Sequence, residues 1–205
     1  MVPDEDAPPA DELEDRTSVK APSEATAETR AEAQPSNRQE RDAAAAEELR
    51  VKHHRRGAYH EAGHAAARWA QLGDYCSIEL EADGTGFAQG PDSGDIEKFD
   101  RARIEAEIRF TIAGPVAEAT SAGIPVQFVW YGGAGQADVV KLTDLLDRAC
   151  AQGWLIDREQ EAQRYGAETE ELLRQHWPFV VRLAEALLSS GRVSADEMRQ
   201  LSRAP

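Results

Sequence analysis

The chain has 205 residues, of which 41% are hydrophobic and 30% charged, and its formal net charge is −15 at pH 7. This length allows one domain with a tail, and the negative charge argues against nucleic acid or an anionic membrane as main partner, because both would repel the protein. No apolar run approaches the roughly 18 residues of a membrane-spanning helix, so we expect no membrane insertion.

Cys76 and Cys150 are the only cysteines, too few for a disulfide framework and not spaced as CxxC. The N-terminus is acidic and contains proline, whereas a signal peptide is first basic and then apolar. We therefore expect a cytoplasmic protein in a reducing compartment.

The first 45 residues consist mainly of Ala, Glu, Asp, Pro, Ser and Thr and contain almost no large apolar side chain. Such a segment cannot bury enough apolar surface to offset the entropy lost on ordering. We predict that residues 1–45 are a disordered acidic tail and that residues 46–205 form the folded domain, which begins with an alanine-rich, helix-favouring run.

The next element carries an HExxH motif on a helix predicted from about Ala58 to Leu72, after a break at Gly57. On a helix, His60 and His64 stand one turn apart on the same face, so both imidazoles can bind one ion. Zinc suits nitrogen ligands, and three protein ligands leave its fourth position for water. Glu61 lies one residue further round, where it can take a proton from that water.

His53 and His54 are rival metal ligands close to the motif. Adjacent residues on a helix point about 100° apart, so these two cannot bind one ion as an i,i+4 pair does. We interpret them as part of a polar segment that leads into the motif helix.

The stretch from Cys76 to Glu81 alternates apolar and polar side chains, which predicts a half-exposed strand before the turn residues 83–86. An extended peptide could pair along the edge of this strand and be held across the metal. A purely structural hairpin is the alternative. The candidate substrate-binding residues are Ser77, Ile78, Glu79 and Leu80.

The remaining elements are predicted to be helical, which makes the fold class mainly α. A helix to about Ala113 is expected to stop at Gly114–Pro115 and a new one to start at Val116, because proline is well tolerated at a helix start. Residues 121–135 are predicted to be irregular and 136–149 helical. A long helix over 158–188 is kinked or divided at Pro178, and Ser194 begins a last short helix with a capping box.

A catalytic metal site needs a third ligand beyond the two histidines. The candidates by chemistry alone are Glu118, Asp138, Asp144 and His176. Asp138 follows a glycine-rich turn and falls in the first turn of a predicted helix, where the helix dipole favours the ionised carboxylate that a metal requires. A simple helix N-cap is the competing interpretation of Asp138.

Four segments occur in one order: the HEAGHA string at 60–65, the strand and turn at 77–87, the AGPVAE string at 113–118 and the GAGQAD string at 133–138. In the content and order of these segments, residues 58–201 resemble the zinc-protease domain of the FtsH-type, membrane-bound AAA+ proteases. The resemblance implies a mainly helical zinc-peptidase fold with a substrate-pairing edge strand beside the active site. It also implies that Asp138 is the third zinc ligand and that Glu118 orients a ligand histidine.

The chain departs from that family in two respects. Family members carry an ATPase module and membrane helices ahead of the protease domain, whereas none of the four lysines here follows a glycine, which rules out a P-loop. Residues 126–131, before the glycine-rich turn, also differ from the family pattern. We therefore expect activity that does not itself depend on ATP. A homo-oligomer and a separate unfoldase remain open as partners.

The sequence thus predicts a zinc-dependent endopeptidase that hydrolyses unfolded or flexible polypeptides, with Glu61 as general base for a zinc-activated water. A peptidase specific for one regulator would have the same site. The alternative is a non-catalytic, zinc-containing regulatory or adaptor module that binds peptides on its edge strand. The presence of Glu61 argues against this alternative, because a structural zinc gains nothing from a general base.

Overall fold

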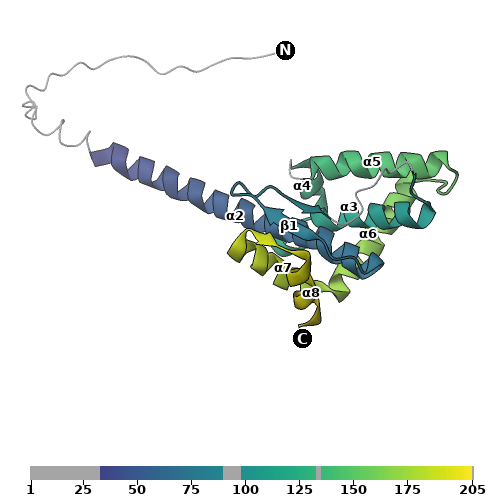
Figure 1. The fold of residues 1–205 in the computed structure, drawn as a ribbon. Helices are drawn as coiled ribbons and strands as arrows, with labels where there is room; N and C mark the ends of the chain where they lie inside the picture. The colour runs from purple at the N-terminus through teal and green to yellow at the C-terminus, as the bar shows by residue number, and fades with distance from the viewer. Residues whose placement is uncertain (1–32, 90–97, 133–134, 205) are drawn as a thin grey trace, which may run out of the picture. The chain divides into compact units, whose positions relative to one another are not determined.

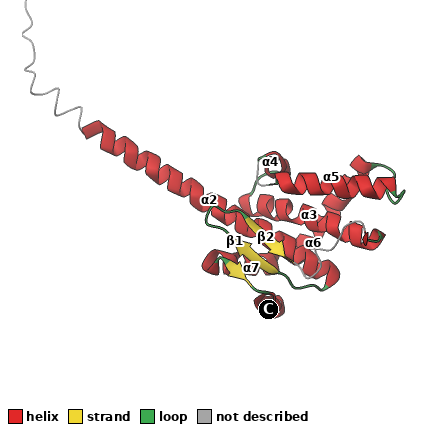
Figure 2. Cartoon of the chain, turned by 45° about the horizontal axis from the view of Figure 1, so that its top comes forward, coloured by secondary structure: helices red, strands yellow, loops and turns green. Residues whose placement is uncertain are grey.

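The computed structural model describes residues 33–89, 98–132 and 135–204, with side chains from residue 38 onward. It divides into two compact units, residues 1–44 and 45–205. The described part is mainly helical, with seven helices and one small three-stranded antiparallel sheet (Figures 1 and 2). Everything that follows on packing and on the site concerns the second unit.

Helix α2 spans Ala33–Leu72 without interruption and carries the HExxH motif in its C-terminal part. It corrects one expectation, because no break occurs at Gly57. Residues 33–45 of the predicted tail belong to the same helix, and residues 1–32 lie outside the described part. The reason at Gly57 is tertiary. A Cβ there would collide with the carbonyl oxygen of Gly84, so the glycine serves a close approach of the turn rather than a helix end.

The sheet has the order β2-β1-β3, with β1 at Ser77–Leu80, β2 at Gly86–Gln89 and β3 at Arg192–Val193. Ile78 of β1 is paired with both Ala88 of β2 and Val193 of β3. The predicted strand is therefore confirmed, but the prediction that it is an edge is wrong, since both of its sides are occupied. The alternation of side chains predicts which face is buried and carries no information about the neighbours.

Helix α3 spans Arg101–Ala122, and the predicted interruption at Gly114–Pro115 does not occur. A proline inside a helix costs about 3 kcal/mol. Here a largely buried stretch from Ile104 to Ala119 packs against its neighbours and outweighs that cost. Part of the segment predicted to be irregular is also helical, because Val126–Tyr131 form the short helix α4.

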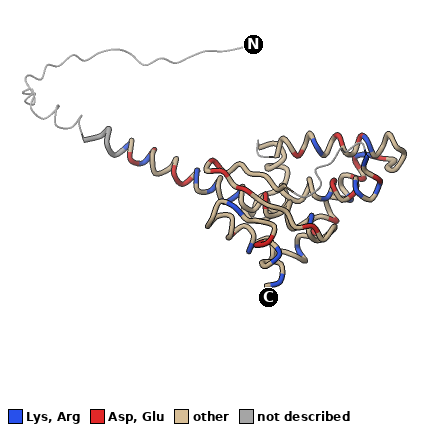
Figure 3. The backbone as a smooth tube through the Cα atoms, in the orientation of Figure 1, with Lys and Arg blue, Asp and Glu red and all other residues tan. Residues whose placement is uncertain are grey.

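Helix α5 spans Gln136–Ala151, as expected to within two residues, and the C-terminal region contains α6 (Arg158–Gln175), α7 (Trp177–Ser190) and α8 (Ala195–Arg203). The predicted division at Pro178 is confirmed, because this proline lies in the first turn of α7. The predicted capping box is confirmed at Ser194 and Glu197. Acidic and basic side chains are interspersed along α5 and α6 (Figure 3), and Arg164 of α6 forms ion pairs with Glu161 and Glu168.

The hydrophobic core is made by side chains from α2, β1, α3 and the C-terminal helices, including Ala62, Ile78, Ile108 and Leu183, none of which is exposed. Sheet strand β1 lies against α7 and α8 (Figure 2). Among the described helices, none combines the length and the apolar character required to cross a lipid bilayer.

Candidate metal centre

The two histidines of the motif face α3 across a close crossing of helices. A Cβ on Gly63 of α2 would lie 2.5 Å from both the carbonyl oxygen of Ala113 and the Cβ of Ala117. A Cβ on Gly114 of α3 would lie 2.8 Å from the Nε2 atom of His60 and would collide with the imidazole of His64. The two glycines thus let the helix backbones approach and leave free the space between the imidazoles.

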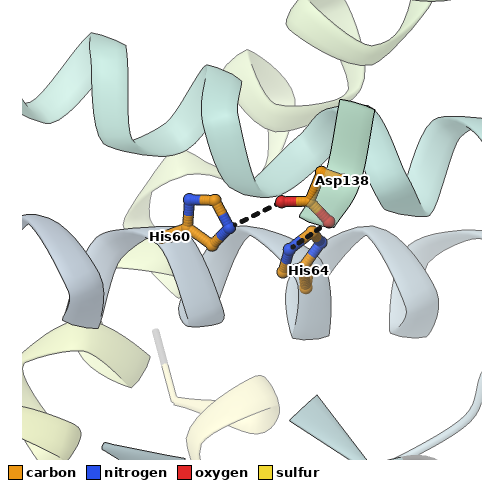
Figure 4. A group of neighbouring side chains, drawn as sticks. All are labelled: His60, His64 and Asp138. Carbon is orange, nitrogen blue, oxygen red and sulfur yellow. Dashed lines mark hydrogen bonds and ion pairs between the residues drawn. The ribbon is translucent and has the colours of Figure 1, made fainter. Parts of the chain in front are cut away.

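Asp138 completes a group of three side chains, as Figure 4 shows. Its carboxylate, in the first turn of α5, points at both imidazoles: Oδ2 lies 2.9 Å from Nε2 of His60 and Oδ1 lies 3.5 Å from Nε2 of His64. One potential ligand atom from each residue lies within 4.8 Å of the others. All three are largely shielded from solvent.

The outer ring nitrogen of each histidine has its own acceptor on α3. His60 Nδ1 lies 3.0 Å from Oε2 of Glu118, and His64 Nδ1 lies 2.7 Å from the carbonyl oxygen of Phe110. A carboxylate and a carbonyl can only accept, so both Nδ1 atoms carry the hydrogen. Once the histidines are neutral, both Nε2 lone pairs point toward Asp138, which is the arrangement that metal-binding histidines require.

The electrostatics of the group depend on burial and on the close contacts. Burial alone would lower the pKa of His60, but the bonds to Asp138 and Glu118 outweigh it and raise the pKa to about 9. Burial opposes ionisation of both carboxyls, yet the histidines hold the pKa of Asp138 below its usual range, and His60 together with Arg56 does the same for Glu118. Both carboxylates are therefore ionised at neutral pH.

The residues fit a small divalent cation. Ligands roughly 2.0–2.1 Å from a tetrahedral zinc ion lie about 3.3 Å from one another. The imidazole nitrogens lie 2.9 and 3.5 Å from the two oxygens of Asp138, and one ligand atom from each of the three residues lies within 4.8 Å of the others. The missing side chain of Gly114 keeps this space free. A set of two imidazoles and one carboxylate suits zinc, although related transition metals accept the same ligands.

Glu61 lies beside the group and takes no part in it. Its side chain is buried, the residue being 7% exposed, and among the described residues none donates a hydrogen bond to its carboxylate. Burial raises the pKa of Glu61, with the nearby histidines opposing this. A Cβ on Gly86 would lie 2.7 Å from Cγ of Glu61, so strand β2 passes directly over this side chain.

A cleft of about 480 Å³ lies beside the group, and His60 is the member of the group that lines it. Its walls come from α2, the β1–β2 turn, Glu118 of α3 and Gly132, and His60 and Glu61 lie among them. This volume lies within the range of about 300–1,000 Å³ that is usual for ligand sites.

The other candidate ligands lie elsewhere or have other partners. Asp144 forms an exposed ion pair with Arg148, and His176 ends α6 with its ring against Trp69. His53 lines the outer part of the cleft. None of these joins the group of three. Glu118 reaches only the outer nitrogen of His60, so within the described residues Asp138 alone of the four candidates could share one metal ion with both histidines.

The free edge of the sheet nearest the group is β2 rather than β1. The N–H of Glu81 donates to the carbonyl oxygen of Thr85, and the strand alternation then turns the backbone groups of Phe87 toward β1 and those of Gly86 and Ala88 outward. Within the residues that the structure describes, no strand pairs with this outer side. Ser77–Leu80 have their backbone groups occupied on both sides.

Three contributors to the site are absent from the sequence predictions. Gly114 was interpreted as a helix breaker, and the Phe110 carbonyl is a backbone group without a sequence signature. Arg56, which binds Glu118, stands four residues before His60, so the helical spacing would have found it if the motif helix had been extended beyond Gly57.

No protein-family model matches this chain, and no curated protein matches it significantly. The resemblance to FtsH-type protease domains therefore stays a prediction from the sequence motifs. The functional inference depends on the geometry of the site.

Proposed function

We propose that this protein is a zinc-dependent endopeptidase, similar in design to the FtsH-type protease domains, that hydrolyses unfolded or flexible polypeptides. One observation carries the proposal: two imidazole Nε2 atoms converge on the Asp138 carboxylate, while the neighbouring Glu61 has no hydrogen-bonding partner among the described residues and borders an open cleft. A structural metal site gains nothing from such a carboxylate, whereas a hydrolytic site requires one.

Each residue of the group has a defined part in the proposal. His60, His64 and Asp138 hold the metal, and Glu118 and the Phe110 carbonyl keep the imidazoles in the tautomer that binds it. When bound, zinc supplies a Lewis acid that polarises a carbonyl and lowers the pKa of a coordinated water toward roughly 7.

The proton chemistry belongs to Glu61. Its carboxylate accepts a proton from the attacking water and later donates that proton to the amide nitrogen that leaves. Burial raises the pKa of Glu61 toward neutral pH. A pKa nearer to the working pH favours both the uptake of the proton from water and its donation to the leaving nitrogen.

The substrate class follows from the edge of β2. The outward N–H and C=O groups of Gly86 and Ala88 can pair with an extended polypeptide, and Gly86 lies directly over Glu61. In a folded protein most backbone N–H and C=O groups are already paired, so few segments can pair with this edge. The proposed substrates are therefore unfolded segments, either free in solution or supplied by an unfoldase partner.

The decisive experiment measures zinc content and cleavage of casein for the wild type, for Glu61→Gln and for Glu48→Gln. We expect Glu61→Gln to retain one zinc per chain and to lose cleavage by about 10³-fold, because the general base is gone. Glu48 lies on the same helix but is exposed and paired with Lys52, so Glu48→Gln should behave as the wild type.

Two results of this experiment would contradict the proposal. A wild type that binds zinc but cleaves no unfolded protein or peptide would favour the adaptor module. Equal cleavage by the wild type and Glu61→Gln would remove Glu61 from the mechanism. As a companion, Asp138→Ala should weaken zinc binding, and unchanged binding would move the third ligand elsewhere.

A further inference from the structure

Glu118 is a carboxylate inside the crossing of α2 and α3, where the residue is 1% exposed. Its two oxygens have different partners. Oε2 accepts the hydrogen bond from Nδ1 of His60 at 3.0 Å, and Oε1 accepts one from Nε of Arg56 at 2.7 Å. Nη2 of Arg56 lies 2.6 Å from the same Oε1. A buried carboxylate that loses one of two such partners is strongly destabilised.

We propose that Arg56 is a positioning residue for the metal ligand His60 and that it acts through Glu118. This inference rests on the metal site proposed above. Two nitrogens of the guanidinium occupy Oε1 and so hold the plane of the carboxylate, which leaves Oε2 directed at the imidazole. Arg56 thereby influences the orientation of His60 through Glu118, which binds both residues.

The position of Arg56 on α2 makes this effect specific. Arg56 and His60 are four residues apart, so they lie on one face of the helix and both reach the same side chain of α3. Glu118 of α3 thus binds two side chains of α2, Arg56 and His60, and links the two helices. A rotation of the imidazole away from the metal position would have to break the bond that Arg56 holds in place.

A plain counter-ion would explain the same contact differently. In that case Arg56 would neutralise Glu118 and stabilise the helix pair, with no influence on the metal. The two roles predict different measurements. A counter-ion changes the free energy of unfolding, whereas a positioning residue also changes zinc affinity at temperatures at which every variant is folded.

The test is a series of zinc dissociation constants, measured by competition with a chelator at 25 °C. The variants are Arg56→Gln, Arg56→Lys, Glu118→Leu and the double variant Arg56→Gln/Glu118→Leu. The matched control is Arg55→Gln, since Arg55 is the neighbouring exposed residue and its guanidinium lies over the ring of Tyr59. Thermal unfolding of the zinc-free proteins shows that each is folded at the temperature of the titration.

We expect Arg56→Gln to bind zinc more weakly than the wild type, by no more than the roughly 10- to 100-fold that is typical when a direct partner of a metal ligand, here Glu118, is lost. Arg56→Lys should lie between the two, because an ammonium keeps the charge but not the forked geometry. On the Glu118→Leu background, the substitution Arg56→Gln should raise the zinc dissociation constant by less than about threefold, because the carboxylate that links Arg56 to His60 is already absent.

Three outcomes overturn the inference. The first is equal zinc affinity of Arg56→Gln and Arg55→Gln, and the second is an effect of Arg56→Gln that is undiminished on the Glu118→Leu background. The third applies if Arg56→Gln does not fold, and it is a zinc affinity of Arg56→Lys equal to that of the wild type. A wild type that binds no zinc overturns the proposed function as well. A wild type that binds zinc without cleaving peptides overturns the proposed peptidase activity but not the role of Arg56, because this series measures zinc affinity and not turnover.

Discussion

The motif helix α2 has two sides that are built on different principles. Toward α3 it presents His60 and His64, which are held by polar acceptors at a crossing that depends on two glycines. Away from that crossing its aromatic side chains pack against the C-terminal helices, as Tyr59 does on Trp177 and Trp69 on Phe179.

Single atoms matter more on one side of α2 than on the other. On the α3 side, the direction of one lone pair or the presence of one methyl group determines whether an ion can bind. On the C-terminal side, the stabilisation follows the apolar area that is buried, so a substitution changes stability in proportion to the atoms removed. Substitutions on the two sides should therefore separate metal affinity from stability.

Gly114→Ala should have the largest effect on the α3 side. The added methyl group would meet the imidazoles of both histidines, which would have to rotate away from the metal position and break their bonds to Glu118 and the Phe110 carbonyl. We expect a folded protein that no longer binds zinc tightly, with affinity at least about a hundredfold lower, because both ligands are displaced. Isothermal titration with zinc, together with a thermal unfolding curve, measures both quantities.

Gly63→Ala is the matched control at the same crossing. Its methyl group would meet the backbone carbonyl of Ala113, which cannot move aside as a side chain can. This variant should lose about 1–3 kcal/mol of stability through overpacking. Equal loss of zinc affinity in the two variants, with equal stability, would contradict the distinction between them.

Leu183→Ala examines the C-terminal side. Leu183 is fully buried in α7, and truncating a buried leucine typically costs about 2–5 kcal/mol. We expect this loss in urea-induced unfolding at fixed temperature, with zinc affinity unchanged under conditions in which the variant is folded. A large loss of zinc affinity in the folded variant would show that the two sides are coupled.

The stability of the α3 side should depend on pH, because the pKa of His60 is strongly raised there. The pKa of His60 is raised from 6.5 to about 9 in the folded, zinc-free protein. Its contribution to stability is therefore fully present below pH 6.5 and is lost as the pH rises through 9. At about 1.4 kcal/mol per pKa unit the loss is on the order of 3 kcal/mol.

Urea unfolding of the zinc-free protein at pH 6.5 and pH 9.5 measures this change. His60→Gln should show a much smaller difference between the two pH values, because the titrating group is gone. The cost of Leu183→Ala should be the same at both, since no titratable atom is removed. A wild type whose stability does not fall over this range would contradict the raised pKa of His60.

Local patterns were sufficient for part of the molecule. The helical spacing predicted that His60 and His64 share a face. The position of Asp138 in a first helical turn favoured it among four candidates but left a simple N-cap open, and only the family resemblance assigned it as the third ligand. Secondary structure with strong periodicity, as in α5, was predicted to within two residues. These features depend on neighbours within one or two helical turns, which the sequence displays directly.

The predictions that failed depend on contacts between distant segments. Gly57 and Pro115 are signals of helix ends, but here a turn packs on the glycine and neighbouring helices bury the segment around the proline. Strand β1 is central because Arg192 and Val193 pair with it from more than 100 residues away. Local propensity cannot report such pairings, since tertiary packing decides them.

The corrected edge strand gives the smallest predicted effect, on substrate binding rather than on zinc. Ala88→Pro removes an N–H that points away from β1, so no bond of the sheet is lost and the protein should fold normally. If a substrate pairs with this edge, KM for an unfolded substrate should rise by roughly two- to tenfold, the worth of one hydrogen bond, with zinc affinity unchanged.

Phe87→Pro provides the contrast, because the N–H of Phe87 faces β1 and its removal breaks the pairing with Glu79. This variant should be destabilised, whereas Ala88→Pro should not. An unchanged KM in a stable Ala88→Pro variant would mean that the substrate does not pair along β2. Since both edges of β1 are occupied, the peptide would then have to be held by the walls of the cleft alone.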